Sequence, residues 1–174
     1  MTPFILAVVA ASVFLTAAIS GVFGMAGGLI LMAILVNLMS LQAAMAVHAS
    51  IQLVSNGWRC FLWRGHIVWR VLPFYIAGML AGIIVIAFVR YVPDKALTLL
   101  MMGSMPLLAM LAGKNLRLSI MSGWQTFVSA ACLTFVQMTA GVVGPLLDLL
   151  YNNAPLTRQQ IVSTKAFTQM AMHC

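Results

Sequence analysis

The sequence predicts an all-α polytopic membrane protein made of two inverted repeats with glycine-rich broken, re-entrant helices, the second repeat being incomplete. Three observations lead to this fold class. Of the 174 residues, 63% are hydrophobic and only 6% are charged, whereas soluble domains carry about 25% charged residues. The basic residues lie beside long apolar stretches. Two of these stretches are interrupted by glycines at corresponding places. A soluble domain and a disordered chain are therefore both excluded.

The few polar residues also exclude several classes of function. The two acidic residues, Asp94 and Asp148, lie far apart, which argues against hydrolysis by paired carboxylates. The three cysteines, Cys60, Cys132 and Cys174, are too widely spaced for a disulfide framework or a metal site. The net charge of +7 comes from basic residues that are not interleaved with aromatic ones, so nucleic acid is not predicted as a partner. We predict no catalytic residue, no cofactor and no metal.

Two apolar segments are too long to be single spans. Residues 4–39 are uncharged and would form a helix of about 54 Å, although the hydrocarbon core is about 30 Å thick. Residues 118–151 pose a similar problem. We expect each to fold as a V of two half-helices of about 17 residues, broken at glycines that line protein or a cavity. The break residues are Gly24, Gly27 and Gly28 in the first segment and Gly141, Gly144 and Pro145 in the second.

The remaining apolar segments read as single helices. Residues 42–58 form a shorter, more polar helix, while residues 71–89 and 96–113 are long enough to span the bilayer. The N-terminus lacks the positive charge of a signal peptide, so the first segment is expected to stay in the membrane.

The two breaks coincide when the chain is shifted on itself by about 117 positions. Gly24 then falls on Gly141 and Gly27 on Gly144. The same shift places Gln52 on Gln169 and His48 on Lys165, and Ala49 on Ala166. Interrupted apolar segments at corresponding positions point to the binding site of a transporter, although small-residue packing faces between helices are the alternative. We therefore expect a first membrane repeat at residues 1–117 and a second at 118–174, truncated by roughly 60 residues.

The basic residues set the expected orientation. The loop that holds Arg59 and two further arginines should be cytoplasmic, and residues 90–95 should face the other side. Lys114 then returns to the cytoplasm, and folding back of the second break keeps Arg158 there too. Each unit would have an odd number of crossings, so the two units would be inverted relative to each other.

Three motifs resemble those of the TauE/SafE-type sulfite exporter permeases. The first is the segment Gly21-Val-Phe-Gly24-Met-Ala-Gly27-Gly28, in which Ala26 interrupts the family's run of three glycines. The second is Gly141-Val-Val-Gly144-Pro145, followed by Ile161-Val-Ser-Thr164-Lys165-Ala166. The third is Arg64-Gly65-His66-Ile67, followed by an apolar helix with Gly78 and Gly82. The resemblance implies a multi-pass permease of the bacterial inner membrane for small anions such as sulfite or sulfonates.

The candidate binding residues are the polar groups near the breaks. Half-helices that begin at Gly27–Gly28 or at Gly144 present unpaired N–H groups, which suit anions. Lys165 lies in an otherwise uncharged stretch, where a cation marks a pathway, unless it snorkels to the surface. Gln52 and Gln169 are expected either to donate to an anion or to join helices.

Three further polar residues have two interpretations each. His48 is either a ligand-binding group or a helix-packing residue. Asp148 is either a proton-coupling residue or the ion-pair partner of Lys165 or Arg158. Thr164, with Asn56 and Gln137, completes the set of binding candidates.

The function predicted from these residues is transport of a small anion by alternating access, with no covalent chemistry. The alternatives are an anion channel and a membrane-embedded assembly subunit that does not transport. The predicted partners are a small anionic substrate and the lipid bilayer, and the sequence does not set the oligomeric state.

Overall fold

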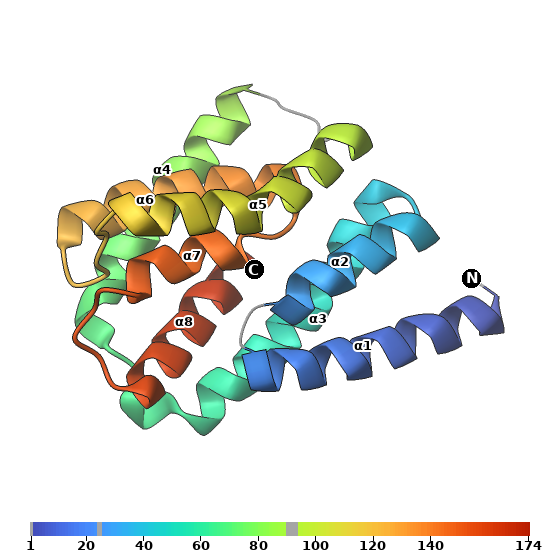
Figure 1. The fold of residues 1–174 in the computed structure, drawn as a ribbon, viewed down its shortest axis with the longest axis horizontal. Helices are drawn as coiled ribbons and strands as arrows, with labels where there is room; N and C mark the ends of the chain where they lie inside the picture. The colour runs from blue at the N-terminus through green and yellow to red at the C-terminus, as the bar shows by residue number, and fades with distance from the viewer. Residues whose placement is uncertain (1, 24–25, 90–93) are drawn as a thin grey trace.

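In a computed structural model the chain is a bundle of helices, and every regular element among the described residues is helical (Figure 1). The structure describes residues 2–23, 26–89 and 94–174. Two short 3-10 helices, η1 (Arg64–His66) and η2 (Trp69–Val71), connect α3 to α4. The predicted all-α class is confirmed. The α-helices are α1 (Pro3–Phe23), α2 (Ala26–Leu38), α3 (Leu41–Leu62), α4 (Leu72–Val89), α5 (Lys95–Asn115), α6 (Gly123–Ala140), α7 (Gly144–Tyr151) and α8 (Arg158–Met172).

Three helical stretches are long and apolar enough to cross a membrane. They are Pro3–Gly21 in α1, Trp69–Val89 in η2 and α4, and Lys95–Gly113 in α5. Large apolar side chains on these helices, such as Phe14 and Phe88, are exposed on the surface of the bundle. A broad apolar surface of this kind marks contact with lipid. The protein is a multi-pass membrane protein.

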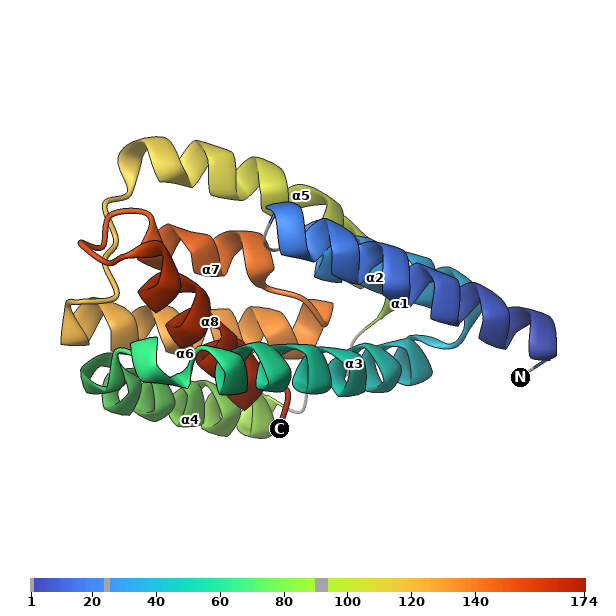
Figure 2. The same ribbon diagram turned by 90° about the horizontal axis from the view of Figure 1, so that it is seen from below.

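The first break turns the chain back on itself. Helices α1 and α2 pack side by side as a hairpin, coloured in shades of blue in Figures 1 and 2. A Cβ atom on Gly27 would overlap the carbonyl oxygen of Thr16 and the hydroxyl of Ser20. The close approach of the two helices therefore requires glycine at this position. Gly24, the other glycine predicted here, lies outside the described residues.

The second break is formed by a glycine cap and a proline start. Helix α6 ends at Gly141, which has a φ of 73° and donates its N–H to the Gln137 carbonyl over 2.8 Å. Glycine adopts this left-handed conformation without steric cost. Helix α7 starts at Gly144 with Pro145 in its first turn, where the missing N–H of proline has no helical partner to lose.

The arms of the two breaks are unequal, so the expectation of half-helices of about 17 residues each was wrong. Helices α1 and α2 have 21 and 13 residues, and α6 and α7 have 18 and 8. The expectation placed each break at the middle of its apolar stretch, but Gly141 and Pro145 set the second break and α7 ends after eight residues.

Helix starts recur along the chain at a nearly constant offset. Helix α3 begins at Leu41 and helix α8 at Arg158, 117 positions apart. Each of these helices has a hydroxyl N-cap: Ser40 accepts from the Ala43 N–H, and Thr157 accepts from the Gln160 N–H. Two broken-helix units therefore share the order long arm, break, short arm and capped helix. This order supports the repeat, which remains a prediction with its inverted orientation.

The core of the bundle joins the two units. Helix α4 packs on α6, and α8 packs on α3. A Cβ atom on Gly78 would overlap the carbonyl oxygen of Phe127, and one on Gly82 would lie 2.6 Å from that of Ala131. Glycines four residues apart on one face allow helices in membranes to approach this closely. Buried Tyr75 on α4 donates its hydroxyl to the Met172 sulfur on α8 over 3.0 Å.

We expect Gly78→Ala to destabilise the protein, because its methyl group would be forced into the backbone of α6. Overpacking of this kind costs roughly 1–3 kcal/mol. The thermal unfolding midpoint in detergent should fall markedly. Gly103 in α5 has no atom within 4 Å of its Cβ position, so Gly103→Ala is the matched control and should leave the midpoint unchanged or raise it. Equal midpoints for the two variants would contradict the tight α4–α6 contact.

Candidate functional site

Both helix breaks line one cavity of about 460 Å³. Gly27 and Gly28 contribute from the start of α2, and residues 142–145 contribute from the second break. The rest of the wall comes from α1, α3, further residues of α2, Gln137 of α6, Gln169 of α8 and His173 just after α8. Segments more than a hundred residues apart in sequence therefore meet at one site, which lies in the size range of small-molecule pockets.

A stripe of polar residues runs along the cavity face of α3. His48, Gln52, Asn56 and Arg59 are spaced by four, four and three residues, which places them on one side of the helix. The side-chain amide of Asn56 donates to the side-chain oxygen Oε1 of Gln52 over 3.3 Å, and Nε2 of Gln52 lies 3.5 Å from Nε2 of His48. We call these four residues the α3 stripe. At 1.5 Å per residue the stripe is about 16 Å long.

His48 is a buried member of the α3 stripe. Its side chain is 2% exposed and donates from Nε2 to the Gly28 carbonyl oxygen over 3.0 Å. Gly28 is held close, because a Cβ atom there would lie 2.9 Å from the Gln52 amide nitrogen. The ring of His173, just after α8, meets the His48 ring edge to face at 5.7 Å. His48 thus ties the short arm of the first break to α3.

Two glutamines of the second unit, Gln137 and Gln169, lie in the wall of the cavity. Gln137 donates from its amide to the Gly141 carbonyl oxygen over 2.9 Å, which satisfies a carbonyl beyond the end of α6. Gln169 on α8 lines the cavity, as does Gln52, its counterpart in the predicted repeat. The cavity wall therefore receives an amide side chain from each unit.

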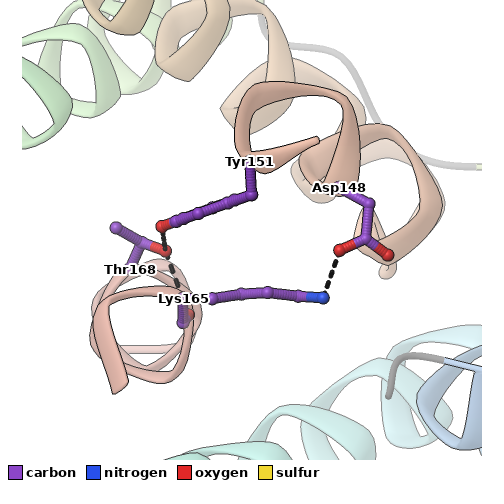
Figure 3. A network of polar contacts seen from close by, with 4 residues as sticks. All are labelled: Asp148, Tyr151, Lys165 and Thr168. Carbon is purple, nitrogen blue, oxygen red and sulfur yellow. Dashed lines mark hydrogen bonds and ion pairs between the residues drawn. The ribbon is translucent and has the colours of Figure 1, made fainter. Parts of the chain in front are cut away.

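Lys165 and Asp148 form an ion pair that joins α8 to α7 (Figure 3). Beside it, the Tyr151 hydroxyl lies 3.3 Å from the Thr168 hydroxyl, which donates to the Lys165 carbonyl oxygen. The Lys165 side chain is 14% exposed and that of Asp148 39%. The ion pair largely cancels the charge of the lysine, and of the two partners considered for Asp148 the structure selects Lys165.

The comparison with known proteins gives one match. The family model of the sulfite exporter TauE/SafE matches residues 9–173. The chain belongs to the TauE/SafE family. No curated protein and no solved structure matched the chain. The resemblance drawn from the glycine motifs is thereby confirmed, and this TauE/SafE protein is a membrane transporter and not an enzyme.

In this TauE/SafE protein the predicted site residues fall into two groups. The first group lies in the wall of the cavity and comprises Gly27, Gly28, His48, Gln52, Asn56, Gln137, Gly144 and Gln169. The second group, Gly141, Thr164, Lys165 and Asp148, lies outside the wall. Thr164 instead accepts a hydrogen bond from the Val68 N–H over 3.0 Å, which anchors α8 to the segment before α4.

Arg59 is the charged residue that the sequence analysis did not place in the site. We expected it in a cytoplasmic loop, but α3 continues through Arg59 to Leu62, and the side chain lines the cavity. It lies close enough to Lys165 for the two positive charges to repel each other. The spacing of His48, Gln52 and Arg59 on an otherwise apolar helix was the signal that could have placed Arg59 there.

The side chains of the cavity wall determine which groups a ligand could meet there. Among the residues that the structure describes, no group of three or more His, Cys, Asp or Glu side chains is placed to hold a metal ion. None of the described residues that line the cavity is acidic. The wall therefore offers amide, hydroxyl, imidazole and guanidinium groups to a ligand.

We expect Lys165→Met and Asp148→Leu each to destabilise the protein, because each leaves the opposite charge without its partner. Asp148 is partly exposed, so we expect roughly 1–3 kcal/mol, below the cost of a fully buried pair. The double variant should recover most of the loss. The yield of monodisperse protein and the unfolding midpoint in detergent measure this coupling. The control Lys95→Met changes an exposed lysine at the start of α5. Additive losses in the double variant would contradict the pairing.

Proposed function

We propose that this protein moves a small oxyanion, such as sulfite or an organosulfonate, across the bacterial inner membrane by alternating access. One observation carries the proposal: both glycine breaks and the α3 stripe line the same cavity. Interrupted helices from two repeats that meet at one polar site are typical of secondary transporters.

The cavity favours negative charge for three reasons. Helices α2 and α7 begin at its wall, so their N-terminal dipole ends face a ligand there. Arg59 adds a positive charge, and a guanidinium binds oxyanions through two parallel hydrogen bonds. The wall holds no acidic residue that would repel an anion. The substrate should therefore be an anion that is small compared with a volume of about 460 Å³.

We assign ligand contacts to six of the predicted residues that line the wall: Gly27, Gly28, His48, Gln52, Gly144 and Gln169. Gly141 shapes the second break and Thr164 anchors α8, so these two support the site from outside. Lys165 adds positive charge near Arg59 to the extent that Asp148 does not neutralise it. A proton on Asp148 would release Lys165, and for this reason we retain Asp148 as the coupling residue.

The predicted repeat defines which helices would move together during transport. Helices α1 to α3 would form one moving unit and α6 to α8 its counterpart, within repeats at residues 1–117 and 118–174. Rocking of one inverted repeat against the other exposes a fixed site to alternate sides of the membrane. The cavity between α3 and the second break lies where two such units would meet.

We expect Arg59→Gln to weaken anion transport strongly. Loss of a charged partner from a desolvated site costs roughly 2–5 kcal/mol, so the KM for sulfite flux into proteoliposomes should rise about tenfold or more. Arg59→Lys keeps the charge without the fork of donors and should lose less. The control is Arg64→Gln, because Arg64 is exposed, donates to the Phe61 carbonyl and covers the Phe61 ring at 4.7 Å.

Saturable flux that depends on Arg59 and not on Arg64 supports the proposal. Flux that does not saturate indicates a channel. Absence of anion flux from folded protein indicates a non-transporting subunit.

A further inference from the structure

All four tryptophans of the sequence lie at one end of the bundle. The connections between α3 and α4, between α5 and α6, and between α7 and α8 meet at this end, on the left of Figure 2. The Ile120 N–H donates to the Leu150 carbonyl over 2.8 Å, and the Asn153 amide donates to the Leu118 carbonyl over 3.3 Å. The tryptophans beside these connections are all exposed: Trp58, Trp63, Trp69 and Trp124.

The tryptophan rings are held by aromatic neighbours while they remain exposed. Trp124 is 74% exposed and stacks on Phe127 with ring centroids 5.9 Å apart. Trp69 meets Phe167 edge to face at 5.8 Å. A tryptophan side chain combines an apolar ring with an N–H donor, so it favours the level at which lipid tails meet headgroups. The four rings therefore mark the headgroup region at this end of the bundle.

Three exposed arginines lie among the same connections. Arg70 belongs to η2, Arg117 follows α5 and Arg158 begins α8. None of the three makes an ion pair or a side-chain hydrogen bond with another described residue. Arg64 is also exposed here, but its guanidinium donates to the Phe61 carbonyl and covers the Phe61 ring. Three guanidinium groups are therefore available to a partner outside the chain.

Neither acidic residue of the sequence balances these arginines. Asp148 is paired with Lys165. Asp94 accepts from the backbone at the start of α5, whereas Arg117 follows the other end of that helix. The helix has 21 residues and is about 32 Å long. Exposed positive charge without a counter-charge in the protein attracts anions from its surroundings, and at headgroup level these are lipid phosphates.

We propose that this end of the bundle binds the headgroups of anionic phospholipids. We call the surface formed by Arg70, Arg117 and Arg158 with the four tryptophans the basic end. A guanidinium holds a phosphate by two parallel hydrogen bonds, and tryptophan rings pack at the same level of the bilayer. Phosphatidylcholine is disfavoured, because its choline cation offsets its phosphate. The basic end shares no residue with the cavity wall, so the inference stands apart from the proposed transport function.

The tryptophans themselves report which lipids surround the basic end. A bromine atom on an acyl chain quenches the fluorescence of a tryptophan that it contacts. The whole chain is placed in vesicles of phosphatidylglycerol and phosphatidylcholine, in which one lipid at a time is brominated. Because the sequence has no other tryptophan, quenching measures the lipid at the basic end alone. We expect brominated phosphatidylglycerol to quench more strongly, and high salt to reduce the difference by screening exposed charge.

Single variants test the arginines. Arg70→Gln and Arg158→Gln should each lower the preference for phosphatidylglycerol by up to about fivefold, the contribution expected of one basic residue near an anionic surface. Lys95→Gln is the matched control, because it removes an exposed positive charge at the start of α5 and should leave the preference unchanged. Each variant changes an exposed side chain, and monodisperse elution in detergent checks that the fold is kept.

Three results overturn the inference. The first is equal quenching by the two brominated lipids in the wild-type protein. The second is a preference that falls as much in Lys95→Gln as in Arg70→Gln and Arg158→Gln, or in none of them, because it would then follow from the net charge of the chain. The third is a preference that inorganic phosphate abolishes and sodium chloride of the same ionic strength does not, which would assign the basic end to a soluble anion. None of these results depends on sulfite flux, so the proposed function stands or falls separately.

Discussion

A helix that is interrupted inside a bilayer leaves backbone groups that water cannot reach, and each unpaired group there costs several kcal/mol. The rest of this structure depends on meeting that constraint at two breaks. At the second break Gln137 does so twice: its carbonyl accepts from the Gly141 N–H, and its amide donates to the Gly141 carbonyl. At the first break the arms lie so close that glycine is required at position 27. Residues 141–144 of the second break and Gly27 beside the first are buried against protein, so these parts of the chain are shielded from lipid.

The same constraint explains where the cavity lies. At the first break His48 of α3 bonds the Gly28 carbonyl, and polar side chains of α3 and α8 line the cavity beside both breaks. Helices α3 and α8 are less apolar than α1 or α4, because α3 carries His, Gln, Asn and Arg side chains and α8 carries Gln, Thr, Lys and Arg side chains. Such helices are stable in a membrane only where other helices cover the polar face. The outer layer of α1, α4 and α5 supplies apolar surface to lipid. The position of the cavity and the position of the lipid-facing surface therefore both follow from the difference in polarity between these two sets of helices.

Sequence reasoning was most successful where single residues dictate backbone geometry. Gly27, Gly141 and Pro145 set the two breaks, and long uncharged runs set the spans. The lengths of the arms were wrong, since an apolar run does not show where its helix ends. Side-chain partners were harder to predict. From the sequence Asp148 could pair with Lys165 or Arg158, and the position of α7 beside α8 in the folded chain selects Lys165. Arg59 was missed because a basic residue at the end of a helix usually marks the membrane surface.

The distribution of charge connects the fold to the proposed function. The sequence has nine basic residues and only two acidic ones. Asp94 accepts from the N–H groups of Leu97 and Ala96, which hold the pKa of its carboxyl below the ordinary value, so this acid serves as a helix cap. Asp148 is used by Lys165. Neither acid is left to balance Arg59, whose guanidinium lines the cavity. In the proposed transport function, an anion in the cavity supplies the counter-charge that neither acid gives to Arg59.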